Sequence, residues 1–228
     1  PRYFFCFSAG RSGSSWLAQV LGGASNAVCA HETYWLFPGM QKPVFDNEHM
    51  RAFFEQRDGR DAFVNDTAIR EIRERAAPLA SGMLYGEATT TTAGSLDLIH
   101  TAFGNLARYV FITRSPIDWA RSALERGYFD PSHKSPCIHV GTIRNPPLPV
   151  WVDWESCTPL AKNLLWWHAV SVVTLDQLKR IPSTQWKLLR THELTSENAR
   201  SLYDFLGLKG FEENGVDRKA SLPLNCSP

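Results

Sequence analysis

Short apolar segments alternate with helical segments along most of this chain, and this alternation limits its fold more than any other feature. Residues 3–8 form an apolar and aromatic run that ends at Ala9 and Gly10, and residues 14–22 carry apolar side chains at helical spacing. Residues 109–113 form another such run, and a helical stretch follows them. Strands that alternate with helices predict an α/β fold, a three-layer sandwich in which helices cover both faces of a mainly parallel central sheet. Ligands of such folds bind outside the carboxyl ends of the strands.

The rest of the chain continues this pattern. The other predicted strands are 27–30, 83–86 and 186–190, and the other predicted helices are 48–57, 64–77, 96–106, 116–126, 159–180 and 195–206. Ser115, Pro116 and Asp118 predict a helix start with a capping box. A chain of 228 residues is the length of one sizeable domain, so we expect residues 1–228 to share one core.

Residues 128–158 interrupt the alternation. They contain five prolines and no sustained periodicity, and they carry Trp151 and Trp154. An irregular excursion of this length is usually a lid or a binding loop. We therefore expect these residues to border an acceptor cleft that the two tryptophans line.

Composition and charge exclude several classes of protein. Hydrophobic residues make up 43% of the chain, which is typical of a globular protein and not of a disordered one. Lys and Arg number 24 and Asp and Glu 23, so no overall field would hold a nucleic acid, and an anion needs a local site. The five cysteines form no C-x-x-C pair, so we expect mostly reduced thiols and no metal.

The sequence carries no sign of a membrane span or an export signal. The opening apolar run is far shorter than the roughly 20 residues that cross a bilayer, and it lacks the basic start of a signal peptide. We expect a cytoplasmic protein. The first residue is Pro1, which fits loss of an initiator methionine or trimming of a longer N-terminus, an anchor included, and both alternatives stay open.

The first candidate site is the segment 8–16. Its glycines, Gly10 and Gly13, free the backbone to wrap around an anion above the start of a helix. Arg11 lies between them, and a guanidinium matches phosphate oxygens with two hydrogen bonds. Hydroxyl groups come from Ser12, Ser14 and Ser15. The segment is not a Walker A loop, because the glycines are only three positions apart and no Lys follows the second one. The alternative is an ordinary turn in which a serine caps the helix.

The second candidate site lies where the strand 109–113 ends. Arg114 follows this strand, and Ser122 lies two turns into the next helix, so a second anion could be held between them. The alternative for Arg114 is a surface ion pair. Two anion sites at strand ends of one α/β chain predict a ligand with separated phosphates.

At these two sites the sequence resembles the sulfotransferases that use 3′-phosphoadenosine 5′-phosphosulfate (PAPS). Residues 8–16 resemble their 5′-phosphosulfate loop, and Arg114 with Ser122 eight positions later resembles their 3′-phosphate motif. The stretches 189–194 and 205–208 are similar to the late strand and helix of these enzymes, so the resemblance covers residues 3–208.

The resemblance implies a P-loop NTPase-like sulfotransferase fold. It also implies PAPS as donor, 3′-phosphoadenosine 5′-phosphate (PAP) as product, no metal, and transfer to a hydroxyl of a carbohydrate, lipid, polyketide or other small molecule. It assigns donor binding to Arg11, Ser12, Gly13, Ser14, Ser15, Trp16, Arg114, Ser122, Arg218 and Lys219. Trp16 would stack on the adenine, although its helical spacing fits a core residue equally well.

The departures from the family pattern indicate a subclass. Cytosolic small-molecule sulfotransferases carry Lys where this chain has Arg11, whereas carbohydrate, tyrosylprotein and many bacterial sulfotransferases carry Arg. An arginine does not readily give up its proton, so Arg11 would act by charge and hydrogen bonding. The Lys-Thr-His sequence that supplies the base of the cytosolic type is also missing, and the comparable stretch, residues 86–89, reads Gly-Glu-Ala-Thr. Glu32 resembles the base of carboxylate-dependent members, and Glu87 and His31 are the rivals.

Two other functions fit parts of this pattern. A nucleotide-binding, kinase-like P-loop protein would share the fold, but the absent P-loop Lys and the pair Arg114 and Ser122 count against it. A non-catalytic PAP-binding scaffold would keep both anion sites but would not need a base at Glu32.

Overall fold

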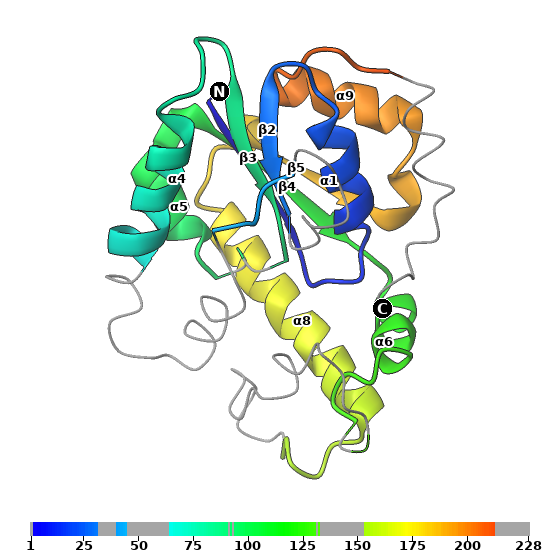
Figure 1. The fold of residues 1–228 in the computed structure, drawn as a ribbon. Helices are drawn as coiled ribbons and strands as arrows, with labels where there is room; N and C mark the ends of the chain where they lie inside the picture. Colours follow the sequence, from blue (N-terminus) through cyan, green and yellow to red (C-terminus); the bar gives the residue numbers. More distant parts are fainter. Residues whose placement is uncertain are drawn as a thin grey trace.

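The architecture is a five-stranded parallel sheet with helices on both faces, seen in a computed structural model (Figure 1). The structure describes residues 2–31, 40–44, 64–90, 92, 94–130, 132 and 153–212. The strands are β1 (Tyr3–Ser8), β2 (Ala27–Ala30), β3 (Leu84–Ala88), β4 (Ala107–Thr113) and β5 (Trp186–Arg190), in the spatial order β2-β3-β1-β4-β5. All four strand pairings are parallel, which confirms the predicted fold class.

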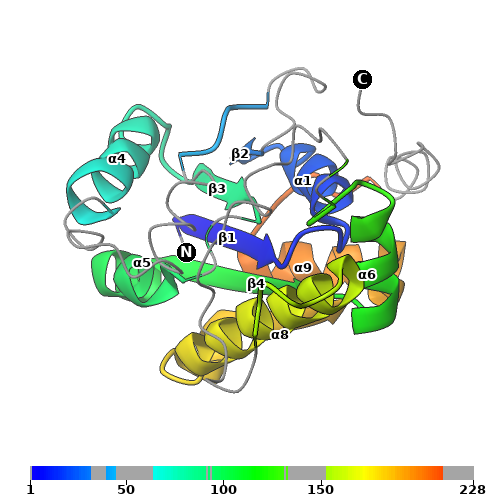
Figure 2. The same cartoon turned by 90° about the horizontal axis from the view of Figure 1, so that it is seen from below.

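The helices divide between the two faces of the sheet. The α-helices are α1 (Ser14–Gly22), α4 (Arg70–Ala76), α5 (Leu96–Phe103), α6 (Pro116–Leu124), α8 (Pro159–Leu178) and α9 (Ser196–Leu206). A π-helix, η2 (Val64–Ile69), runs into α4, and short 3-10 turns are η3 (Gly104–Leu106), η4 (Ser183–Gln185) and η5 (Thr191–Glu193). Helices α1 and α9 pack on one face, α4 and α5 pack on the other, and α6 packs against α8 (Figures 1 and 2).

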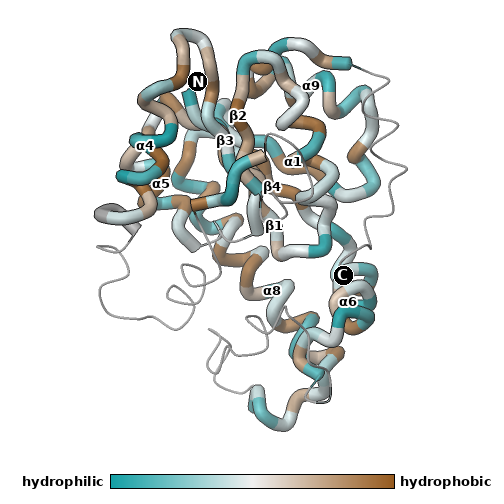
Figure 3. Tube along the Cα trace, in the orientation of Figure 1, coloured by the Kyte–Doolittle hydropathy of each residue, from teal (hydrophilic) through white to brown (hydrophobic). Residues whose placement is uncertain are grey.

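Strand β1 lies at the centre of the sheet and supplies both cores. Every residue of it is buried, which explains its unbroken apolar sequence. Phe4 and Cys6 point to the side of α1 and α9, whereas Tyr3, Phe5 and Phe7 point to the side of α4 and α5. Figure 3 shows hydrophobic residues concentrated on the central strands and on the helices that cover them.

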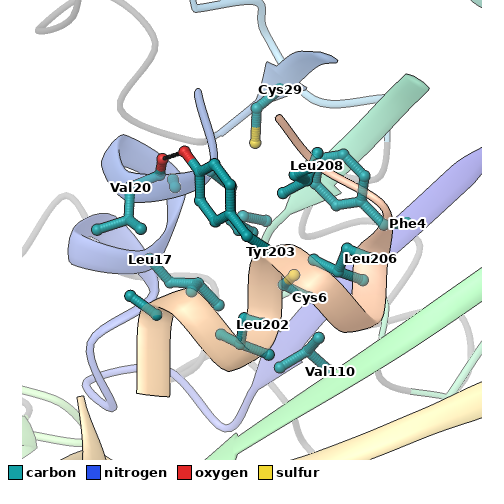
Figure 4. Close-up of a cluster of buried hydrophobic side chains, with 14 of the residues drawn as sticks. Phe4, Cys6, Leu17, Val20, Cys29, Val110, Leu202, Tyr203, Leu206 and Leu208 are labelled. Atoms are coloured by element: carbon teal, nitrogen blue, oxygen red, sulfur yellow. Dashed lines mark hydrogen bonds between the residues drawn. The ribbon is translucent and has the colours of Figure 1, made fainter. Parts of the chain in front are cut away.

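One buried cluster packs α1 and α9 together on one face of the sheet. Leu17 from α1 and Leu202 from α9 pack over Phe4 and Cys6 of β1 (Figure 4). The hydroxyl of Tyr203 donates a hydrogen bond of 2.7 Å to the carbonyl of Val20. The cluster therefore fixes α1, and with it the loop that precedes α1.

The structure departs from the sequence prediction at several element ends; for example, β3 runs to Ala88 and β4 begins at Ala107. The helix predicted over 64–77 begins as the π-helix η2, and the helix predicted over 96–106 ends at Phe103 and continues as a 3-10 turn. The capping box at Ser115 is wrong, because the Ser115 side chain makes no capping hydrogen bond. Pro116 sets the backbone of the first turn, and Trp119 N closes that turn on Ser115 O at 2.8 Å.

Several predicted features lie wholly or partly outside the described residues. The helix 48–57 is one of them, and most of the excursion 128–158 is another. Within the described ranges, no helix is long and apolar enough to cross a membrane, and no group of His, Cys, Asp and Glu side chains could hold a metal ion. Cys6, Cys29 and Cys157 are free thiols.

Candidate functional site

The loop between β1 and α1 has a left-handed backbone at three of its residues. Gly10, Arg11 and Gly13 have φ angles of 84°, 49° and 95°. Glycine adopts this conformation without penalty, but for Arg11 it is a strained one of the kind found at functional sites. The loop turns the chain sharply at the carboxyl end of β1, and α1 begins at Ser14.

The side chain of Arg11 reaches from this loop to α6. Its Nε donates a hydrogen bond of 3.2 Å to Oγ of Ser122, which is largely buried. Because the Ser122 oxygen accepts this bond, its own O–H remains a donor for another group. The two segments singled out in the sequence therefore touch each other through their side chains.

Arg114 makes a second connection between the same segments. It follows β4, and its Nη1 donates a hydrogen bond of 3.1 Å to the carbonyl of Arg11. Strands β1 and β4 are parallel neighbours, with Ser8 beside Ile112, so their carboxyl ends and the loops that follow them lie together. Two arginines consequently lie at the edge of the sheet that the carboxyl ends of β1 and β4 form.

This edge is also a point where the strand order reverses. The chain places β2 and β3 on one side of β1 and places β4 and β5 on the other side. Ligands of open α/β sheets bind at such a reversal, outside the carboxyl ends of the strands. The N-terminus of α1 adds a positive dipole end and backbone N–H groups that have no partner within the helix. The arrangement is chemically suited to a ligand with more than one anionic group.

No family model matches the sequence, and no curated protein matches it. Solved structures do match the fold. The sulfotransferase domain from the curacin biosynthetic pathway is 17% identical with a TM-score of 0.58, and the match covers 98% of this chain and 79% of that one. The sulfotransferase from Alicyclobacillus acidocaldarius is 19% identical with a TM-score of 0.54, over 92% of this chain and 81% of that one.

The chain has a sulfotransferase fold. The sulfotransferase domain from the Synechococcus PCC 7002 olefin synthase is also similar, with 16% identity, a TM-score of 0.50, and coverage of 100% of this chain and 90% of that one. The fold that the sequence resemblance implied is therefore confirmed, and the candidate residues can be located within it.

Within the sulfotransferase fold, Glu87 lies on β3 with 0% of its side chain exposed. Its Oε1 accepts hydrogen bonds from the backbone N of Val44 at 2.8 Å and from the hydroxyl of Tyr85 at 3.0 Å. Burial, and after it the charge of Glu87, raises the pKa of Tyr85 and raises the pKa of Cys29 to about 12. Through its bond to Val44, Glu87 holds residues 40–44 against the sheet.

His31 and Glu87 mark the carboxyl ends of neighbouring strands. His31 directly follows β2, is buried, and donates from its backbone N to the carbonyl of Gln41 at 3.0 Å. Ala30 pairs with Glu87 across β2 and β3. The third base candidate, Glu32, comes next in the chain but lies outside the described residues.

The tryptophans assigned to ligands have different surroundings. Trp16 is 3% exposed and packs in the cluster of α1 and α9, which matches the alternative of a core residue, so adenine stacking stays a prediction. Trp154 packs edge-on against Phe129 with 5.2 Å between ring centroids, and Lys162 lies over its ring at 5.4 Å. Trp151, Arg218 and Lys219 lie outside the described residues.

Two residues that contact the loop were not singled out from the sequence. Trp119 of α6 and Thr191 of η5 both hydrogen-bond to loop carbonyls. Trp119 reads as an ordinary core residue of an amphipathic helix, and Thr191 lies 179 positions after its loop partner. No local pattern links either residue to the loop, so only the tertiary structure could identify them.

Proposed function

We propose that this protein is a PAPS-dependent sulfotransferase that transfers a sulfonate group to a hydroxyl of a small-molecule or carbohydrate acceptor. The observation that carries the proposal is the junction of the two sequence motifs within a sulfotransferase fold. Arg11 bonds to Ser122, and Arg114 bonds to the backbone of Arg11. A ligand that bridges the two motifs needs separated anionic groups, as PAPS has.

The residues present suit the donor chemically. Arg11 and the serines at the start of α1 would bind the 5′-phosphosulfate, because they combine a fixed charge with hydroxyl and backbone donors. Arg114 and Ser122 would bind the 3′-phosphate, with the Ser122 O–H donating to it. Trp16, Arg218 and Lys219 complete the proposed donor site. No metal is required, because guanidinium groups supply the positive charge.

The reaction would follow an in-line path. The acceptor oxygen attacks sulfur as the bond from sulfur to the bridging phosphate oxygen breaks, which yields a sulfate ester and PAP. Glu32 would take the proton of the acceptor hydroxyl as the new bond forms. Arg11 would stabilise the negative charge that develops on the leaving phosphate, without donating a proton to it.

The described part of the excursion 128–158 supports an acceptor site with aromatic walls. Trp154 and Phe129 pack together there, and α8 contributes Lys162 beside them. Aromatic faces suit the rings of sugars and the carbon skeletons of lipids and polyketides. Two of the structural neighbours are domains from the curacin biosynthetic pathway and from an olefin synthase, so small-molecule acceptors should be tried first.

The decisive experiment is transfer from labelled PAPS to a panel of hydroxyl acceptors. The proposal predicts acceptor-dependent formation of a labelled sulfate ester and of PAP. Tight PAP binding without transfer to any acceptor would favour a non-catalytic scaffold. Phosphate transfer from ATP in the same assay would favour a kinase-like protein.

A further inference from the structure

The loop after β1 is held by its carbonyl groups. Each carbonyl of residues 10–13 accepts a hydrogen bond, and the donors come from four different parts of the fold. The donors are Trp119 Nε1 for Gly10 at 2.6 Å, Arg114 Nη1 for Arg11 at 3.1 Å, Thr191 Oγ1 for Ser12 at 3.1 Å and Leu17 N for Gly13 at 3.0 Å. We call these four bonds the carbonyl clamp.

Trp119 holds the first carbonyl of the clamp from α6. Its side chain is 0% exposed and packs against Trp166 and other residues of α6 and α8. An indole N–H is a donor only, and a buried one needs an acceptor. The Gly10 carbonyl supplies that acceptor, and the hydroxyl of Ser12 also donates to the same carbonyl at 2.8 Å.

Thr191 connects the loop to the neighbouring strand. Its Oγ1 lies 3.1 Å from the carbonyl of Ser12 and 3.1 Å from the carbonyl of Thr113, the last residue of β4. The single hydroxyl hydrogen is shared between the two carbonyls. Thr191 therefore sets the position of the loop after β1 relative to the end of β4.

Fixing the carbonyl groups also fixes the direction of the N–H groups on the opposite side of the backbone. In a trans peptide the carbonyl of one residue and the N–H of the next point in opposite directions within one plane. Clamping the carbonyls of residues 10–13 therefore directs the N–H groups of residues 11–14 away from the clamp. A peptide that flipped would instead turn a carbonyl oxygen toward a bound anion and repel it.

We infer that Trp119 and Thr191 are positioning residues, which hold the N–H side of the loop toward the phosphosulfate end of the donor. The identity of the ligand rests on the proposed function, whereas the clamp itself does not. Neither residue needs to touch the donor. Their effect on binding would pass through the peptide groups that they fix.

Trp119→Phe tests the first contact, with Trp166→Phe as its matched control. Both changes remove the same atoms from the same buried cluster. Trp119 is a donor of the carbonyl clamp, whereas Trp166 is not among its four donors. Trp119→Phe should speed hydrogen exchange of the Leu17 amide, whose N–H donates to the Gly13 carbonyl of the loop, and weaken PAP binding about 2- to 10-fold, as expected for one hydrogen bond. Trp166→Phe should leave both quantities unchanged at a comparable melting temperature.

Thr191→Val and Thr191→Ser test the second contact. Valine keeps the shape of threonine without the hydroxyl, so Thr191→Val should speed hydrogen exchange of the same loop-bonded amide and weaken PAP binding. Serine restores the hydroxyl and should rescue both. Equal behaviour of the two variants would overturn the role of the Thr191 hydroxyl.

The two measurements separate this inference from the proposed function. If the wild-type protein does not bind PAP, the proposed function and the donor part of the inference fail, and loop exchange still decides whether the clamp exists. If PAP binds but Trp119→Phe and Trp166→Phe have the same exchange and the same affinity, the clamp is overturned while the proposed function stands.

Discussion

Arg11 Nε lies 3.2 Å from Ser122 Oγ, although the two residues are 111 positions apart in the chain. The bond joins the loop after β1 to the second turn of α6. It also occupies the acceptor role of the Ser122 oxygen, which leaves the hydroxyl hydrogen for an incoming phosphate. A ligand that reaches both residues therefore meets groups that are already side by side.

The first prediction concerns the second phosphate of the ligand. The protein should bind PAP more tightly than AMP, because only PAP has a 3′-phosphate for Arg114 and Ser122. Ser122→Ala should weaken PAP binding about 10-fold, which is typical of a hydrogen bond to a charged group, and weaken AMP binding less, because AMP loses only the support that Ser122 gives Arg11. Calorimetry with both nucleotides measures this. Equal affinity of the wild-type protein for PAP and AMP would exclude a separate 3′-phosphate site.

The second prediction separates the charge of Arg11 from its backbone strain. Arg11→Ala and Arg11→Gly should both lose donor binding and turnover, whereas Arg11→Lys should keep part of each because the charge remains. At φ 49° glycine relieves a strain that alanine keeps, so Arg11→Gly should be about 1 kcal/mol more stable than Arg11→Ala. Denaturant unfolding and transfer rates on the same preparations test both parts. Normal turnover in Arg11→Ala would move the leaving-group role to another cation.

The third prediction compares the carboxylates proposed as bases. Glu32→Gln should leave PAP binding nearly unchanged and lower turnover about 10²- to 10⁴-fold, because the proton acceptor is lost. Glu87→Gln should instead lower the melting temperature, since Glu87 is buried and holds Val44 and Tyr85. Full activity in Glu32→Gln would make Glu87, and then His31, the base to test.

The fourth prediction concerns close packing in the sheet. Gly86 is the register partner of Phe4, and a Cβ on Gly86 would overlap the Phe4 ring. Gly86→Ala should therefore destabilise the protein by about 1–3 kcal/mol. The control is Gly22→Ala at the end of α1, where an added Cβ would lie 3.7 Å from Met40 Cε in ordinary contact. The control should be neutral or about 0.4–1 kcal/mol more stable in urea unfolding.

The fifth prediction concerns thiol reactivity. Burial, with the charge of Glu87, raises the pKa of Cys29 to about 12, and burial also raises the pKa of Cys6. Both thiols should stay protonated and unlabelled by iodoacetamide at pH 8 in the folded protein, because the thiolate is the reactive form. Cys157 is partly exposed and should be labelled. Peptide mass spectrometry before and after unfolding distinguishes the three.

The sequence predicted the elements that depend on local signals. The apolar run of β1 and the glycine after α9 mark their element ends in the structure where the sequence placed them, and Gly207 has the left-handed φ of a helix stop. The spacing between Arg114 and Ser122 likewise depends on neighbouring residues, those of the turn after β4 and the first two turns of α6. Such features are set within a few residues of the chain, so a pattern of residue types suffices to find them.

Features that depend on distant contacts were missed or misjudged. Trp119 and Thr191 meet the loop only because α6 and η5 fold back onto it. Glu87 was expected to follow the strand 83–86, but β3 continues to Ala88, so Glu87 lies within the strand, and its role as a base stays a prediction. The capping box predicted at Ser115 was wrong for a local reason, because Pro116 and the backbone bond from Trp119 to Ser115 are enough to start the helix.

The distance along the chain between the loop and Thr191 bears on the order of folding. Residues 10–13 are synthesised before β5, and the hydroxyl that holds the Ser12 carbonyl follows 179 positions later. A nascent chain that stops before β5 contains the sequence of the loop without all the anchors that give it shape. Contacts of such long range form late, because closing a long stretch of chain costs entropy before the contact is gained. Competence to bind an anion is therefore acquired late in folding, once β5 has paired with β4.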